Sequence, residues 1–210
     1  MPANTSRGWP YPLPTEPVTE GAQAIQNVAT ALNNNPFSLY WIGEWVVTSN
    51  TNPITFFTIP QTYRHLLLVA QLRDYGGGAL SGFAALRFNA DSSAAYSNWQ
   101  QTTTDAVAAG VAGGTAATFG FLGVVPEAAS TSGTFSPILC VIPNYAATGY
   151  YKSFLSVSGQ HLGGGAGMHL ATGGGAWTAA SGPAISRIDI WGAANGWLAG
   201  SFVSLYGLGK

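Results

Sequence analysis

The chain has 210 residues, of which 7% are charged and 47% hydrophobic, and its formal net charge is −1. An average soluble domain carries about 25% charged residues, so we expect much of this surface to be coated with uncharged polar residues or covered by other subunits. The composition excludes a disordered chain, which needs low hydrophobicity and high charge. The seven scattered cations exclude nucleic-acid binding by phosphate neutralisation.

Targeting and membrane signals do not stand out in the sequence. Residues 1–15 lack the apolar core of a signal peptide, and no run approaches the roughly 20 apolar residues of a membrane span. We therefore expect synthesis and assembly in a cytoplasm, with no membrane span. The single Cys140 lies in the apolar run Ile138–Ile142, which predicts a buried, inert thiol.

Residues 1–17 form a Pro-rich leader that cannot be helical, because each proline fixes φ and disfavours helix at the residue before it. Large apolar residues alternate with prolines here, so an extended arm is suited to docking in a groove of another protein. The alternative is a disordered tail. The candidate particle-attachment residues are Trp9, Pro10, Tyr11, Pro12 and Leu13.

Residues 18–35 contain the one predicted helix. Its apolar residues recur at steps of three and four, which is typical of one helical face. A helix this short is marginal alone, so the stripe needs a partner: either the same helix in another subunit or the chain's own β domain. The candidate oligomerisation residues are Val18, Ala22, Ile25, Ala29 and Leu32.

Residues 36–210 are predicted to form one β domain. About ten short segments rich in aromatic and β-branched residues are separated by turn signals, and no helical period is present. This pattern predicts a two-sheet sandwich of the jelly-roll type. Two stretches poor in large side chains, Ala106–Thr115 and Gly163–Gly175, are predicted loops.

The sequence predicts no catalytic residue, cofactor or metal site. The three histidines His65, His161 and His169 are well separated, and no nucleophile elbow, phosphate loop or dinucleotide fingerprint occurs. Carboxylates that could still meet in space, as sugar hydrolysis requires, are Asp74, Asp91, Asp105, Glu127 and Asp189.

Aromatic residues in or beside the predicted loops offer another route to function. Such rings stack on sugars, but they also dominate cores and subunit interfaces, so both interpretations remain open. The candidate receptor-facing aromatics are Trp99, Tyr150, Trp177 and Trp197.

Four segments, Ile54–Arg73, Leu86–Trp99, Ile142–Gly159 and Ile185–Leu208, resemble in this order the globular domain of small structural proteins of tailed bacteriophages, often labelled tail-fibre or minor tail proteins. The leader with Ala24–Leu32 is similar to the attachment segments that precede such domains. These are packing and turn signatures rather than a catalytic motif.

The resemblance implies a β-sandwich, commonly trimeric, that is held to the virion by its N-terminal part and projects as a knob, with other virion proteins and a host-surface glycan as expected partners. One alternative is a capsid head fibre or decoration protein with the same plan. Another is a particle-borne carbohydrate-active enzyme, although we expect no enzyme.

Overall fold

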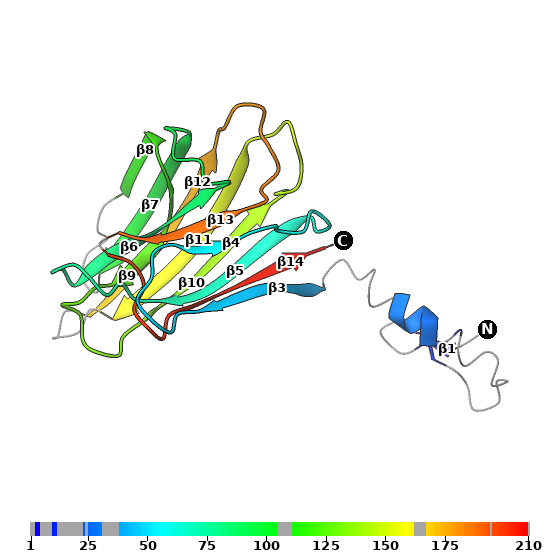
Figure 1. Ribbon diagram of the computed structural model, residues 1–210, viewed down its shortest axis with the longest axis horizontal. Coiled ribbons are helices and arrows are strands. Elements are labelled where there is room, and N and C mark those ends of the chain that lie inside the picture. Colours follow the sequence, from blue (N-terminus) through cyan, green and yellow to red (C-terminus); the bar gives the residue numbers. More distant parts are fainter. Residues whose placement is uncertain are drawn as a thin grey trace.

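The computed structural model describes residues 3–4, 10–11, 23, 25–30, 38–104, 111–161, 167–193 and 195–209. In this part of the chain, two antiparallel sheets pack face to face (Figure 1). The prediction of an all-β, two-sheet sandwich is therefore confirmed.

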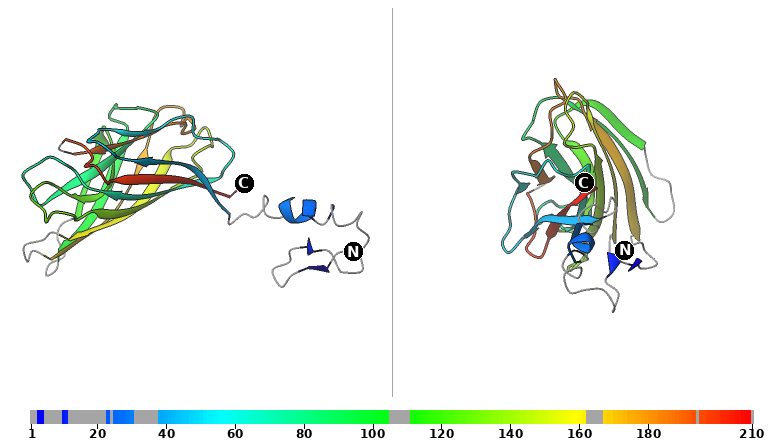
Figure 2. Two further views of the ribbon diagram at one scale, coloured as in Figure 1. Left: turned by 60° about the horizontal axis from the view of Figure 1, so that its bottom comes forward. Right: turned by 90° about the vertical axis from the view of Figure 1, so that its right-hand side faces the viewer.

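The larger sheet has eight strands. Their order across the sheet is β3 (Leu39–Val46), β14 (Phe202–Leu208), β5 (His65–Leu72), β10 (Ser136–Pro143), β11 (Lys152–His161), β12 (Met168–Trp177), β7 (Tyr96–Thr104) and β8 (Val111–Ala117). The smaller sheet has the order β4 (Ile54–Phe56), β13 (Ile188–Gly192), β6 (Ser81–Phe88) and β9 (Gly120–Pro126). Figure 2 shows the two sheets as facing layers. From β3 to β7 the chain changes sheet at every step, as in a jelly roll.

The core lies between the layers and follows the alternation of the strands. In β5 the residues Leu66, Leu68 and Leu72 point inward and are fully buried, as their spacing predicts. On the other side of the same strand, Leu67 and Val69 are half-buried, because β14 and β10 flank β5 while no second layer among the described residues covers this face. The larger sheet therefore has one face in the core and one face outside.

Two loop predictions are wrong. Within the predicted loop Ala106–Thr115, the described residues 111–115 belong to β8, and the glycines Gly173–Gly175 lie inside β12. A Cβ atom on Gly173 would lie 2.6 Å from Cδ1 of Phe121, and one on Gly175 would lie 2.8 Å from Cζ of Phe154. The glycines therefore do not break the strand; they leave room for aromatic rings that lie against its backbone.

The N-terminal segment is only partly described. Ala3–Asn4 (β1) pair antiparallel with Pro10–Tyr11 (β2). Residues 25–30 are helical and lie away from the sandwich (Figures 1 and 2). The Ile25 side chain is 70% exposed, so in the single chain it does not pack on the sandwich. Ala29 is also exposed. The remaining predicted contact residues, Trp9, Pro12, Leu13, Val18, Ala22 and Leu32, lie outside the described residues.

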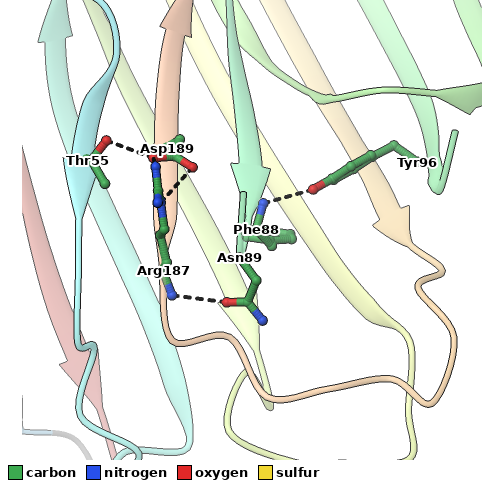
Figure 3. A network of polar contacts seen from close by, with 6 residues as sticks. All are labelled: Thr55, Phe88, Asn89, Tyr96, Arg187 and Asp189. Carbon is green, nitrogen blue, oxygen red and sulfur yellow. Dashed lines mark hydrogen bonds and ion pairs between the residues drawn. The ribbon is translucent and has the colours of Figure 1, made fainter. Parts of the chain in front are cut away.

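Buried charged groups tie the layers and loops together. Asp189 on β13 accepts hydrogen bonds from Thr55 Oγ1 at 2.7 Å and from the guanidinium of Arg187, with which it forms a salt bridge (Figure 3). Arg73 is buried, and its guanidinium donates to carbonyl oxygens of the segment from Glu127 to Thr134. These charges fix backbone positions, because buried charged groups are stable only when paired or hydrogen-bonded.

Candidate functional site

Two of the four aromatic residues predicted to face a receptor are instead buried. Trp177 is 2% exposed and Trp197 is fully buried. The Trp177 indole lies in a cluster with Phe88 and Tyr96, and its Nε1–H donates to Oδ2 of Asp91 at 2.7 Å. The Trp197 indole donates to the Ile190 carbonyl at 3.0 Å. The prediction was wrong for both. Trp177 binds Asp91, which lies far from it in the sequence, and Trp197 binds the buried backbone of β13; the local sequence shows neither contact.

The other two aromatics are exposed, but at different places. Trp99 lies on β7, on the outer face of the larger sheet. Tyr150 lies in the loop between β10 and β11, beside Tyr151, and these side chains are 71% and 66% exposed. The four predicted residues therefore do not form one site.

Tyr150 and Tyr151 border a cleft of about 520 Å³ at the end of the sandwich. Its lining is uncharged, and it consists of Pro143, Asn144, Ala147, Tyr150, Tyr151 and Ser153. Two aromatic faces beside an amide and hydroxyl groups can stack on an apolar ring face and hydrogen-bond its substituents. We call these six residues the tyrosine cleft.

The backbone below the tyrosine cleft is held from several directions. The buried Lys152 donates from Nζ to the carbonyl oxygens of Tyr150 at 2.7 Å and Gly182 at 3.3 Å. Gly149 N also donates to the Gly182 carbonyl at 3.0 Å, and Ile185 N donates to the Tyr145 carbonyl at 2.9 Å. Burial lowers the pKa of Lys152 from its ordinary value. A fixed loop presents its two rings at low entropic cost, which favours binding.

A second groove, of about 470 Å³, opens between β7–β8 and β6–β9. Phe83 and Phe119 stack in its wall with ring centroids 5.5 Å apart. Its Asn98 side chain donates to the Phe119 carbonyl and accepts from Phe121 N, so both ends of the amide are already used within the chain. The groove therefore combines phenylalanine rings with polar side chains such as Gln100 and Thr102.

His169 also borders this groove and is half-buried. Its Nδ1 atom lies 3.2 Å from Ser81 Oγ and 3.5 Å from Gln160 Nε2. Burial lowers the pKa of His169 from its ordinary value. His65 Nδ1, at the other end of the sandwich, accepts from Asn144 N at 3.2 Å. Both imidazole rings thus form their hydrogen bonds with residues of the sandwich itself.

The described carboxylates serve as backbone and side-chain acceptors. Asp74 is fully buried and accepts from the backbone N atoms of Gly76, Asn195 and Gly196. Glu127, also buried, accepts from Ala79 N at 3.3 Å. Burial raises the pKa of Asp91, but the hydrogen bonds from Ser93 and Trp177 outweigh burial and hold this pKa below its ordinary value. These contacts give the three carboxylates a structural role. Another candidate carboxylate, Asp105, lies outside the described residues.

Other chemical signals are few in the described ranges. No three His, Cys, Asp or Glu side chains there are grouped so that they could hold a metal ion. Cys140 is buried as predicted, and burial raises the pKa of its thiol to about 12, so at neutral pH it is neither charged nor accessible. Within the same ranges, no helix is long and apolar enough to cross a membrane.

Sequence reasoning did not single out the exposed apolar residues on the outer face of the larger sheet. Leu155 and Val157 on β11, and Leu139 on β10, point away from the core and are exposed. The strict alternation of exposed and buried residues in Ser136–Pro143 and Lys152–His161 is visible in the sequence as a period of two. What the period cannot show is that the exposed members are also apolar neighbours on adjacent strands.

Comparison with protein-family models, with curated proteins and with solved structures found no match to this chain.

Proposed function

We propose that the protein is a structural subunit of a tailed-bacteriophage virion: a short tail-fibre or minor tail component, anchored by its N-terminal segment, whose β-sandwich forms a knob for contact with the host surface. It acts as a homotrimer and is not an enzyme. It assembles into the virion in the host cytoplasm and needs no cofactor. The support for a phage origin is the sequence resemblance of the four strand-rich segments and the leader.

One structural observation supports a contact function: several charged side chains are buried, whereas several large apolar side chains are exposed. Arg73, Lys152, Asp74 and Asp189 are buried and hold backbone or neighbouring side chains in place. Trp41, Leu155, Tyr150 and Tyr151, by contrast, are each more than 60% exposed. Exposed apolar and aromatic groups bind other molecules, whereas catalysis needs reachable acids, bases or nucleophiles.

The tyrosine cleft is the part of the knob best suited to contact a host glycan. Its rings are exposed, its backbone is restrained, and its lining is uncharged, as expected for a surface that stacks on neutral sugars. Of the aromatics first selected from sequence, Tyr150 belongs to this cleft, and Tyr151 joins it.

A capsid head fibre or decoration protein is the second candidate, since it would use the same anchor-and-knob plan. Gold labelling of this chain on intact virions separates the two: label at the tail supports the first and label at the capsid the second. Deleting residues 1–17 is expected to abolish incorporation while the soluble knob stays folded. Normal incorporation of the deleted chain would contradict the anchor.

Host contact is tested separately. Purified chain labelled with a fluorophore should bind host cells, and Y150A/Y151A should reduce that binding at least about tenfold, because two stacking rings are lost. The control is Y75A, which removes an exposed tyrosine outside the cleft. If the double variant binds like the wild type, the tyrosine cleft is not the adhesive surface. Release of sugars from host-wall polysaccharide would instead support the third candidate, a carbohydrate-active enzyme.

A further inference from the structure

A continuous row of residues crosses the outer face of the larger sheet. Registered from strand to strand, from β3 to β8, it consists of Trp41, Tyr206, Leu67, Val141, Leu155, Gly174, Trp99 and Gly113. Six of these eight positions are aromatic or aliphatic and the other two are glycine. The apolar character therefore spans all eight strands of the sheet rather than one edge.

The neighbouring row continues this surface and carries one charged residue. From β3 to β7 it consists of Glu44, Ser204, Val69, Leu139, Val157, Thr172 and Gln101. Glu44, at the edge strand, accepts a hydrogen bond from Ser204 Oγ at 2.9 Å. We call the two rows together, with Leu170 and Met168 at the end of β12, the outer apolar face.

The outer apolar face is large enough for a stable interface. Its most exposed members, among them Trp41, Trp99, Leu155 and Leu170, together expose on the order of 800 Å², which is what each partner contributes to a standard protein interface. Monomeric proteins seldom expose apolar patches of more than a few hundred Å². The described area therefore matches a binding surface.

The face is also hollowed where a partner's side chains can insert. A depression of about 620 Å³ lies over β10, β11 and β12, and Leu139, Val157, Met168 and Leu170 contribute to its lining. Trp41 and Leu155, both about two-thirds exposed, stand out from the same face. Protruding and hollowed parts on one surface allow two copies to interdigitate.

We propose that the outer apolar face is the main contact between copies of this chain. A copy of the chain offers the uncharged, apolar counterpart that this face requires, whereas a nucleic acid or an acidic lipid surface would bring charges that Glu44 alone would meet unfavourably. The inference goes beyond the proposed function, because it assigns the subunit contact to the sheet instead of the predicted helix stripe. It would hold for this chain in a tail, a capsid or another assembly.

Sedimentation velocity of the purified full-length chain tests this assignment. The wild type is expected to sediment as an oligomer and L155D as the single 21.7 kDa chain. The dissociation constant of the L155D oligomer should rise about a hundredfold or more, because an unpaired carboxylate would be buried at the centre of the contact. L155N provides a second variant without a new charge and should weaken the oligomer less. Because Leu155 is 66% exposed in the single chain, both variants should keep the wild-type circular dichroism.

A128D and I25D complete the experiment. Ala128 is exposed on a loop outside the face, so A128D should leave the oligomer intact. I25D addresses the helix: dissociation by I25D together with an unchanged oligomer in L155D would overturn the assignment and place the contact on the helix. A monomeric wild type would also overturn it, and flotation of that monomer with phosphatidylcholine vesicles would identify lipid as the occupant. A sheet-face variant that is monomeric in solution but still joins virions would support this assignment, and it would leave the N-terminal anchoring part of the proposed function standing.

Discussion

The Nζ atom of Lys152 lies 2.7 Å from the carbonyl oxygen of Tyr150, so a buried cation holds the backbone of an exposed aromatic residue. The same ammonium group reaches the Gly182 carbonyl at 3.3 Å and thereby joins two loops at one end of the sandwich. The exposed ring of Tyr150 and the buried charge of Lys152 therefore act as one unit, in which the charge sets the position of the ring.

Replacing Lys152 by Met tests this restraint. The variant keeps most of the aliphatic stem but leaves two carbonyl oxygens without their donor, so the free energy of unfolding should fall by about 1–3 kcal/mol. Urea denaturation measures this change, and amide exchange of residues 147–151 should become faster. The control R64M removes a charge from an exposed residue and should leave both measurements unchanged. Unaltered exchange in K152M would show that the loop is held by its other contacts.

Two strand glycines should respond differently to a methyl group. A Cβ atom on Gly175 would lie 2.4 Å from the Ser97 carbonyl oxygen, whereas one on Gly114 would meet no atom within 4 Å. G175A is expected to lower the free energy of unfolding by about 1–3 kcal/mol, because backbone must shift to relieve the overlap. G114A should stay within about 0.5 kcal/mol of the wild type. Equal effects in chemical denaturation would contradict the close packing of β12 against β7.

Trp177 and Trp99 form another matched pair. W177F removes the indole N–H that donates to Asp91 and leaves part of the core unfilled, so we expect a loss of about 1–3 kcal/mol in unfolding free energy. W99F alters a side chain that is half-exposed on the outer face and should change the stability of the isolated chain little. Thermal unfolding at a concentration where the chain is monomeric gives the comparison. A larger loss in W99F would mean that the burial of the two rings is reversed.

Acid should destabilise the chain partly through His169. Burial lowers its pKa in the folded state, so below its ordinary value of 6.5 the unfolded chain binds more protons than the folded chain. This contribution to stability is complete above pH 6.5 and is lost as the pH falls from there through the lower pKa of the folded state. Urea denaturation at pH 7.5 and pH 5.5 should therefore show a smaller pH-dependent loss for H169Q than for the wild type. The exposed-site variant H161Q serves as the control, and identical losses in H169Q and the wild type would refute the role of His169.

Much of the fold follows from the residues themselves. The alternation in β5, β10 and β11 separates inward from outward side chains, and the aromatic and β-branched segments mark nearly all strands. The exceptions have a physical cause. Val111–Ala117 and Gly173–Gly175 contain few large side chains, and their strand conformation depends on neighbours such as Phe121 and Phe154, which come from elsewhere in the chain. A window of sequence does not contain that information.

The candidate sites were harder to predict than the fold. An aromatic residue near a glycine-rich loop can point into the core or into solvent. The structure buries Trp177 and Trp197 but exposes Tyr150 and Tyr151. The outer apolar face could not be predicted from sequence. Trp41 and Trp99 stand 58 residues apart in the chain, and only the register of the strands places them in the same row of the sheet. Periodicity predicts which side a residue takes, but not which residues share it across strands.

The inward placement of charge has a practical result for handling the protein. Copies joined by uncharged surfaces gain little from Coulomb attraction, so raising the ionic strength should not separate them. Apolar association weakens on cooling. The affinity between such copies is therefore expected to fall at low temperature and to recover on warming.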